Sequence, residues 1–568
     1  MQTQHRRIPV LPNCPRVRPM AGHISRSYPV GRQSYSRACQ GVVMTLKIIT
    51  EYPIPENIKA KLITTMDSND GKTWNIIPFK GYKARTLICQ ITPKHSGLHS
   101  FRAEFSLDNG ISWIRDTVPD AWVLIDPPQV DGLRLYTLIP TVSGTLADWK
   151  NDLVRIREMG FNAVHMLPIT LLDTTESPYA AKDLFEIDHS YLTNGSEKNG
   201  LLQLEEFIEK AITQNIRLCF DLVLNHVGVN SRMATQAPDW IISDPNQLDG
   251  LKRARFWSNH GWCNWDDLVL INYEHPSDAI REEIWAYMTD YTLFWAKYAN
   301  DTGGFVRFDN LHSSNPDFVQ FLTMALHSEY PDVGILAEYF TDETTLLRTG
   351  PKWGLNLNLA TPWDYKFVSQ LRDYLKYIHR VSRHVRYFMP ITSHDSGTPA
   401  QEFGTADSTV PRYIAAALLG TGATGIIQGV EYGLLEQINF MGRKPKMQYP
   451  YEPRFASFIG QVNAILEKYS AFRHGDNCQF VDDGHPAIIA AYRHDKEDLA
   501  LGFLVVCNFD IYAPQQIGID LTSILGLNGP VPCFELLSNE KCIFKNTYLE
   551  LSLQPCSAKV YRFSVYRE

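Results

Sequence analysis

The chain has 568 residues, a formal net charge of −8 and ten cysteines. This length is enough to bury a large core, and the negative charge gives no sign of a nucleic-acid partner. No apolar run reaches the roughly 18 residues that a membrane-spanning helix needs, so we expect no membrane partner. The cysteines show no CxxC pair and no zinc-ligand spacing. This pattern predicts reduced thiols, a cytoplasmic location and no metal site.

Residues 1–43 are rich in arginine and contain no acidic residue. We predict a disordered tail, either a transit peptide or a segment upstream of a start at Met44. From 44 to 128, short alternating runs separated by turn clusters predict an N-terminal β-sandwich that ends at the Pro127-Pro128 pair. Three tryptophans of this segment either stack on sugars or pack in the core or between domains, and packing is the more common role: Trp74, Trp113 and Trp122.

Residues 129–473 alternate apolar strands with amphipathic helices, which is typical of parallel strands joined by crossovers. Eight strands are predicted, at 134–140, 163–169, 217–223, 304–310, 334–340, 355–361, 386–392 and 422–429. Eight such strands predict an α/β fold, a (β/α)8 TIM-like barrel. A long stretch at about 226–276 interrupts the pattern and predicts a functional excursion over the barrel mouth. Residues 474–568 alternate again and predict a C-terminal β-sandwich.

Ionisable residues follow several of the predicted barrel strands, at the ends where parallel β/α proteins carry their active sites. Packing like charges together costs stability, which favours a functional site over a structural one. The geometry suits glycosidic bond cleavage, in which one carboxylate attacks the sugar and a second acid protonates the leaving oxygen. We predict Asp309 as nucleophile, kept ionised by Arg307, and Glu338 in the apolar run ILAEYF as general acid and base.

Asp395, with His394 and His226, is predicted to bind the sugar hydroxyls at the cleavage point. Asn225 directly precedes His226 and belongs to the same strand end. Each residue alone has a structural explanation: the Arg307–Asp309 pair as an ion pair and His226 as a hydrogen-bonded core histidine. The functional reading depends on their occurring together.

Four segments resemble, in order, the motif regions of the α-amylase superfamily of glycoside hydrolases and transglycosylases. They are FDLVLNHVG (220–228), GFVRFDN (304–310), ILAEYF (335–340) and ITSHDS (391–396). The resemblance extends across roughly 134–470. It implies a TIM-like barrel followed by a β-sandwich and a mechanism that retains the anomeric configuration.

The detail is most similar to the 4-α-glucanotransferase half of glycogen debranching enzymes, whose second motif has the form RxDNxHS. The segment RFDNLHSS (307–314) matches it and puts His312 where ordinary amylases carry a lysine. By the same resemblance Tyr179, in SPYAAKD (177–183), stacks on the sugar at the cleavage subsite. The chain is too short for the second, α-1,6-glucosidase half of the animal enzymes.

These features predict a 4-α-glucanotransferase that acts on α-1,4-glucans, such as glycogen or maltooligosaccharides, through a covalent glycosyl–Asp309 intermediate. One alternative is an α-amylase-like hydrolase, and another is a catalytically inactive glucan-binding barrel. Acceptor-side aromatics decide between transfer and hydrolysis, and the excursion offers Trp257, Trp262 and Trp265. No cofactor is required, although calcium is possible near the excursion. Linkage specificity, a phosphorylated donor and the oligomeric state do not follow from the sequence.

Overall fold

The computed structural model describes residues 30–31, 37–50, 58–83, 86–115, 121–193, 200–258, 261–496, 498, 500–525 and 529–564. The chain divides into two compact units. Unit 1 comprises Met1–Val130, Ile271–Leu357 and Arg383–Val385, and unit 2 comprises Asp131–Leu270, Asn358–Ser382 and Arg386–Glu568.

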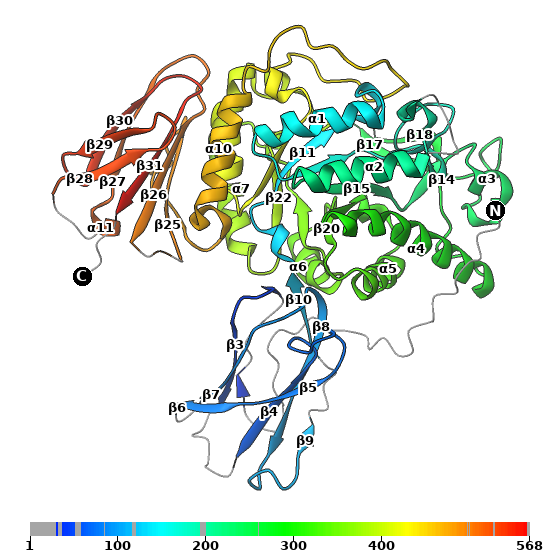
Figure 1. Ribbon diagram of the computed structural model, residues 1–568, viewed down its shortest axis with the longest axis horizontal. Helices are drawn as coiled ribbons and strands as arrows, with labels where there is room; N and C mark the ends of the chain where they lie inside the picture. Colours follow the sequence, from blue (N-terminus) through cyan, green and yellow to red (C-terminus); the bar gives the residue numbers. More distant parts are fainter. Residues whose placement is uncertain are drawn as a thin grey trace. The chain divides into compact units, whose positions relative to one another are not determined.

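Eight strands form a closed barrel in the order β11-β12-β15-β19-β20-β21-β22-β23 (Figure 1). They are β11 (Arg134–Leu138), β12 (Ala163–Met166), β15 (Arg217–Val223), β19 (Phe305–Asp309), β20 (Gly334–Ala337), β21 (Leu357–Leu359), β22 (Tyr387–Pro390) and β23 (Ala423–Ile427). The pairs with a described register are parallel. All eight predicted strands and the TIM-like barrel are therefore confirmed. Their nearly continuous apolar runs fit strands that are buried on both faces.

The N-terminal part of unit 1 is a sandwich of two sheets, blue in Figure 1. One sheet has the order β1-β3-β7-β6 and the other β2-β10-β8-β4-β5, with β9 paired to β8. The strands are β1 (Val30–Gly31), β2 (Arg37–Cys39), β3 (Met44–Thr50), β4 (Lys59–Thr64), β5 (Asn75–Pro78), β6 (Lys80–Lys83), β7 (Thr86–Ile91), β8 (Gly97–Ser106), β9 (Ile114–Arg115) and β10 (Ala121–Asp126). Alternate side chains from both sheets, such as Leu46 and Phe101, share one core.

The predicted disordered tail is wrong at its end, because residues 37–39 form β2 and pair in parallel with β10. Arg37 accounts for this order, since its guanidinium donates two hydrogen bonds of 2.6 Å to the buried carboxylate of Asp126. Asn356 donates to the same carboxylate at 2.9 Å. Most of the predicted tail lies outside the described residues, and the predicted domain boundaries stay predictions.

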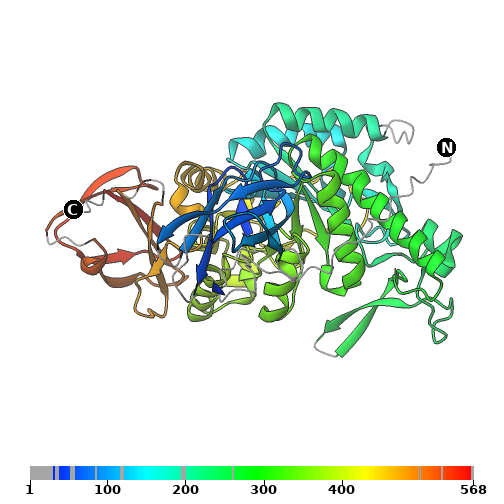
Figure 2. The same ribbon diagram turned by 90° about the horizontal axis from the view of Figure 1, so that it is seen from below.

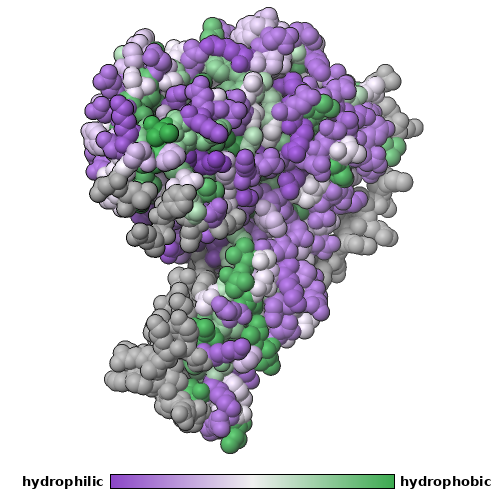
Figure 3. Space-filling view, turned by 60° about the vertical axis from the view of Figure 1, so that its left-hand side comes forward, coloured by the Kyte–Doolittle hydropathy of each residue, from purple (hydrophilic) through white to green (hydrophobic). Residues whose placement is uncertain are grey.

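Apolar side chains are exposed on the N-terminal sheets, as the green areas in the lower part of Figure 3 show. Val42, Val43, Ile76 and Ile111 are each more than half exposed. Trp74 and Trp113 are also partly exposed, and a cation lies over each ring: Arg102 over Trp74 and Lys61 over Trp113. Neither is buried in the core.

Three helices complete unit 1: α4 (Asp278–Asp301), α5 (Pro316–Glu329) and α6 (Glu343–Lys352). Helix α4 contacts β19, and it buries Trp295 and Tyr291 almost completely. Helix α5 begins at an Asn315 cap whose side chain accepts hydrogen bonds from the amides of Asp317 and Phe318. These helices fix the two barrel strands of the unit, β19 and β20, against a rigid apolar layer.

Unit 2 carries the other barrel helices, α1 (Leu146–Glu158), α2 (Gly200–Thr213), α7 (Val368–Val381), α8 (Pro399–Phe403), α9 (Thr409–Leu418) and α10 (Ala456–Lys468), and a short hairpin of β13 (Thr170–Leu172) and β14 (Ala181–Ile187). The predicted excursion is more regular than its composition suggested. It forms a helix, α3 (Arg232–Gln236), and an antiparallel sheet of β16 (His226–Gly228), β18 (Gly261–Leu270) and β17 (Arg253–Ser258). Figure 2 shows β17 and β18 as a long two-stranded ribbon.

The C-terminal part of unit 2 has two sheets, one of β24-β25-β26-β31-β28-β29 and one of β27-β30, around a common apolar core. The elements are β24 (Cys478–Phe480), β25 (Ile488–His494), β26 (Leu501–Asn508), β27 (Gln515–Asp520), α11 (Thr522–Leu525), β28 (Val531–Glu535), β29 (Glu540–Phe544), β30 (Tyr548–Leu553) and β31 (Ala558–Ser564). The C-terminal β-sheet domain is thus confirmed. Among the described residues, no helix is long and apolar enough to cross a bilayer.

Cys533 and Cys542 form a disulfide, so the prediction that all cysteines are reduced is wrong for this pair. The two residues face each other across β28 and β29, with their Cα atoms 5.2 Å apart, a separation that suits a disulfide. The spacing of the two cysteines along the chain does not predict the disulfide, because their pairing follows from the strand register.

Replacement of Asp126 should destabilise unit 1. Asp126→Ala leaves the buried guanidinium of Arg37 without its carboxylate, and breaking a buried ion pair in this way costs about 3 kcal/mol. Urea unfolding followed by circular dichroism measures the loss. The control is Glu205→Ala on an exposed position of α2, which should leave the midpoint nearly unchanged. Equal midpoints for both variants would contradict this role of Asp126.

Candidate active site

The first group of predicted site residues lies in unit 1, at the ends of β19 and β20. The parallel register pairs Arg307 with Leu336 and Phe308 with Ala337, so the next residues in line are Asp309 and Glu338. Side chains two residues apart on a strand share a face. Arg307, Asp309 and Glu338 therefore point to the same side of the two strands.

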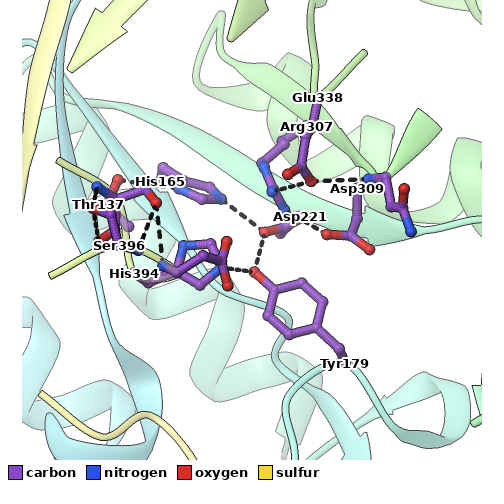
Figure 4. Close-up of polar contacts among 12 residues, drawn as sticks. Thr137, His165, Tyr179, Asp221, Arg307, Asp309, Glu338, His394 and Ser396 are labelled. Atoms are coloured by element: carbon purple, nitrogen blue, oxygen red, sulfur yellow. Dashed lines mark hydrogen bonds and ion pairs between the residues drawn. The ribbon is translucent and has the colours of Figure 1, made fainter. Parts of the chain in front are cut away.

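The guanidinium of Arg307 contacts both carboxylates (Figure 4). Its Nη1 lies 3.1 Å from Oδ1 of Asp309, and its Nη2 lies 2.7 Å from Oε2 of Glu338. All three side chains are largely buried. The prediction that Arg307 pairs with Asp309 thus agrees with the geometry. The expected apolar surroundings of Glu338 do not, because Glu338 accepts hydrogen bonds from Arg307 and from the amide of Asn310.

The backbone after β19 holds the ends of β19 and β20 together at this group of residues. Asn310 adopts the left-handed conformation (φ 44°), which asparagine tolerates better than most residues, and the chain then turns into a 3-10 helix at Leu311–Ser313. The amide of Leu311 donates to the backbone carbonyl of Glu338 at 2.8 Å. As a result, the ends of β19 and β20 are tied together by both main chain and side chains.

His312 follows on the same turn, and its ring lies 5.5 Å from the ring of Phe340. Partial loss of hydration lowers the pKa of His312, while the nearby charge of Glu338 opposes the shift. A neutral imidazole can both donate and accept a hydrogen bond. This side chain therefore suits contacts with sugar hydroxyls.

The second group lies in unit 2 and is centred on Asp221 of β15 (Figure 4). Its Oδ2 accepts hydrogen bonds from Nε2 of His165 at 3.0 Å and from the hydroxyl of Tyr179 at 3.1 Å. The same hydroxyl lies 2.7 Å from Nε2 of His394, and the rings of Tyr179 and His394 are stacked with centroids 5.5 Å apart. Three segments that are far apart in the sequence are thus connected through one phenol group.

Phe440 and Gln437 complete this second group, although neither was predicted from the sequence. Phe440 contacts the edges of both Tyr179 and His394, and Gln437 donates to the carbonyl oxygen of His394. Both come from an irregular loop, where no periodicity marks them. His165 and Asp221 were also missed as site residues. A histidine inside the apolar strand AVHM was the available signal for His165, whose Nδ1 lies 3.2 Å from the hydroxyl of Thr137.

Asn225 and His226 lie deeper in unit 2, where both are buried. Nδ1 of His226 is 2.8 Å from Oδ1 of Asn225, and burial lowers the pKa of His226 to about 4. This arrangement agrees with the structural alternative of a hydrogen-bonded core histidine. Direct sugar binding by the pair stays a prediction. Asp395, by contrast, has a side chain that is 58% exposed, and it lies 3.1 Å from Nε2 of His394.

Among the described residues, no group of three or more histidine, cysteine, aspartate or glutamate side chains is arranged to hold a metal ion. The prediction of a possible calcium ion stays untested. Together the two groups contain carboxyl groups, one arginine and neutral rings that donate hydrogen bonds. Such side chains can transfer protons and orient hydroxyl groups.

Comparisons with known proteins agree with this barrel fold. The profile of the glycogen debranching enzyme glucanotransferase domain matches residues 127–246. Two relatives are named alpha-1,4-glucan:maltose-1-phosphate maltosyltransferase. The one from Arcanobacterium haemolyticum is 23% identical over 433 residues, covering 71% of this chain and 60% of its own length, so the match spans less than two thirds of that relative. The one from Picrophilus torridus is 23% identical over 469 residues, or 76% of this chain and 70% of its own.

Among solved structures, a maltogenic α-amylase from Thermotoga neapolitana has a TM-score of 0.62 and 18% identity, covering 77% of this chain and 99% of that one. This likeness confirms the fold: an eight-stranded parallel barrel with β-sheet domains before and after it. Together with the sequence matches, it makes the chain similar to proteins of the α-amylase superfamily of glycosidases and transglycosylases.

Acid should destabilise this protein because of its buried histidines. Burial lowers the pKa of His226, His327 and His379 to about 4 in the folded chain. Between pH 6.5 and 4 the unfolded chain binds protons at these sites that the folded chain does not, so the free energy of unfolding falls as the pH drops through this window. The loss is on the order of 3 kcal/mol for each histidine.

Unfolding midpoints measured between pH 7 and pH 4 test this expectation. His226→Asn removes one titrating group, so its stability should fall less steeply with pH than that of the wild-type protein. His95→Asn, at a less buried histidine, serves as the control and should keep the wild-type slope. An unchanged slope in His226→Asn would show that His226 does not contribute to the acid sensitivity.

Proposed function

We propose that this protein is a retaining 4-α-glucanotransferase, which cleaves an α-1,4-glucan and transfers the released segment through a covalent glycosyl–Asp309 intermediate. The observation that carries the proposal is the single guanidinium of Arg307 that contacts both Asp309 and Glu338. Two carboxyl groups held by one guanidinium are close together. Retaining glycosidases have their two carboxyl groups roughly 5–5.5 Å apart, whereas inverting enzymes separate them by roughly 6.5–9.5 Å to admit a water molecule.

In this mechanism Asp309 attacks the anomeric carbon, and Glu338 donates a proton to the leaving glycosidic oxygen. The carboxylate of Glu338 then accepts a proton from the incoming hydroxyl group as the acceptor attacks the intermediate. Arg307 stabilises the charge on Asp309 before attack and after release. The rigid turn at Asn310 keeps the two side chains in line and limits the reorganisation that the reaction needs.

We propose that the second group of residues also binds sugar. Tyr179 offers an aromatic ring for stacking on a sugar, and Asp221, His394 and Asp395 offer hydrogen-bonding groups. Asp221, at β15, and Asp309, at β19, belong to strands that are neighbours in the order of the barrel. Active sites of such barrels are built from the carboxyl ends of several strands.

The names of the relatives support transfer to an α-1,4-glucan, and they raise maltose 1-phosphate as the donor. A maltosyltransferase of that kind is the second candidate function. Run in reverse, it uses inorganic phosphate to remove maltosyl units from a glucan and forms maltose 1-phosphate. This reaction requires phosphate, whereas glucan-to-glucan transfer does not.

Incubation with maltoheptaose, followed by chromatography of the products, separates the candidates. Our proposal predicts both longer and shorter oligosaccharides without phosphate. Maltose 1-phosphate formed only in the presence of phosphate identifies the second candidate, and shorter products alone indicate a hydrolase. Asp309→Asn should lower turnover by about 10⁴-fold or more, because the amide cannot form the intermediate. Unchanged turnover in this variant would exclude Asp309 as the nucleophile.

Trp262 on β18 is the exposed aromatic residue of the excursion, with 61% of its surface accessible, whereas the ring of Trp265 packs on Phe256 at 4.7 Å. The side chain of Trp257 lies outside the described residues. We expect Trp262 to bind the acceptor sugar and thereby exclude water. Trp262→Ala should shift the products of maltoheptaose from long to short chains about 3-fold or more, by weakening a stacking contact of about 1 kcal/mol. An unchanged ratio in Trp262→Ala would assign the acceptor subsite elsewhere.

A further inference from the structure

A cavity lies in unit 2, at the amino-terminal ends of β11 and β15, with a volume of about 290 Å³. Its lining residues are polar or charged, apart from one glycine: Asp131, Gly132, Arg134, Arg157, Asn162, Asn215, Arg217, Glu467 and Arg473. We call it the arginine cavity. Arg217 is the first residue of β15, and Asp221 follows four residues later, about 13 Å along the strand. The cavity is therefore separate from the second group of residues around Asp221.

The arginine cavity has four arginines and only two acids, and both acids are engaged. Asp131 pairs with Arg386, which does not line the cavity. Glu467 lies 3.3 Å from Arg134, and its own side chain is 59% exposed. In the part of the chain that the structure describes, no ion pair joins Arg157, Arg217 or Arg473 to a carboxylate. Arg473 interacts electrostatically with Asp131, so Arg157 and Arg217 are the guanidinium groups of the cavity for which the described residues supply no carboxylate partner.

The guanidinium groups of the arginine cavity repel one another, and burial has removed part of their hydration. Burial lowers the pKa of Arg217, and the charge of Arg157 lowers it further. Burial is also the main cause that lowers the pKa of Arg134, and Arg157 contributes there too. Arg157 sits in the last turn of α1, where a cation is favourable for the helix dipole. That benefit explains one arginine, but not the concentration of several around one cavity.

The walls of the cavity are fixed by hydrogen bonds. Arg134 donates through Nε to the carbonyl of Gly160 at 2.7 Å and through Nη1 to that of Gly132 at 3.2 Å. The side chain of Asn162 accepts from the amide of Arg134 and donates to Gly132. Gly132 has a φ of +69°, and a Cβ there would lie 3.2 Å from Cδ of Arg473. The cavity is preformed around the arginines, with close packing that leaves no side chain at position 132.

We propose that the arginine cavity binds the phosphate group of a small ligand, either inorganic phosphate or a phosphorylated sugar. Guanidinium groups donate paired hydrogen bonds whose geometry fits phosphate oxygens. A phosphate group carries more negative charge than a single carboxylate, and Arg157 and Arg217 both line the cavity that would receive it. The volume is near the lower end of the range for small-molecule sites, which is enough for a sugar phosphate.

Calorimetric titration and thermal unfolding of the full chain test the proposal. The probes are inorganic phosphate, glucose 6-phosphate and glucose, each against sodium chloride at equal ionic strength. We expect the phosphate-bearing probes to raise the unfolding temperature, and glucose and chloride to have no such effect. A larger effect of glucose 6-phosphate identifies a phosphorylated sugar, and an equal or smaller one identifies free phosphate. No binding beyond the chloride control overturns the proposal.

Arg217→Gln and Arg157→Gln locate the site. Each should weaken phosphate binding at least 10-fold, and Arg217→Gln should not lower the unfolding temperature without phosphate, because it removes a repulsive charge. Arg348→Gln, at an exposed position of α6 in unit 1, is the matched control and should bind as the wild-type protein does. Binding that persists in both cavity variants overturns the proposal, since it would then belong to another site such as the catalytic one. The readout needs no turnover, so it is independent of the proposed activity.

Discussion

The contact of Arg307 with two carboxylates is the constraint on which the proposed chemistry depends. Asp309 and Glu338 follow each other in line at the ends of β19 and β20, and a buried and a partly buried carboxylate at such a position repel each other. The shared guanidinium compensates this repulsion and fixes both acids on one side of the strands. Removing it would leave two partly buried negative charges unpaired, which is costly for stability as well as for catalysis.

The barrel explains why such a contact forms at this place. Parallel strands bring equivalent positions of successive strands level with one another, so a short run such as FVRFD places an arginine and an acid on the same face. The second group depends on the same principle, because Asp221 and His165 belong to the neighbouring strands β15 and β12. Tyr179 and Phe440 come from loops, and they add aromatic surface beside the side chains that the strands position.

Much of the architecture could be predicted from the sequence, because its signals are local. The eight apolar strands, and the acids that follow them, stand out from periodicity and position alone. Interactions that depend on register could not be predicted in this way. The disulfide of Cys533 and Cys542, the order of β2 through Arg37, and the contact of Arg307 with Glu338 all arise from pairings between strands. Gln437 and Phe440 lie in an irregular loop, where a single sequence has no periodic pattern to indicate a role.

The arginine cavity and the candidate catalytic residues illustrate two different uses of charge. At β19 and β20 the charges are balanced by a shared ion pair, which suits a site that must hold acids ready for proton transfer. Around Arg157 and Arg217 positive charges are in excess, which suits a site that binds an anion. Asp309 lies at the carboxyl end of β19 and Glu338 directly after β20, whereas Arg217 lies at the amino end of β15 and Arg157 near the end of α1.

The central claim is that Asp309 forms a covalent bond to the sugar while Glu338 serves as acid and base. The most direct measurement is mass spectrometry of the Glu338→Gln variant after reaction with maltosyl fluoride, whose leaving group needs no acid. Our account predicts a protein heavier by one maltosyl group, with the label on the peptide that contains Asp309. A label on another residue would contradict the assignment of the nucleophile, and an unlabelled protein that still releases fluoride rapidly would contradict the roles given to both acids.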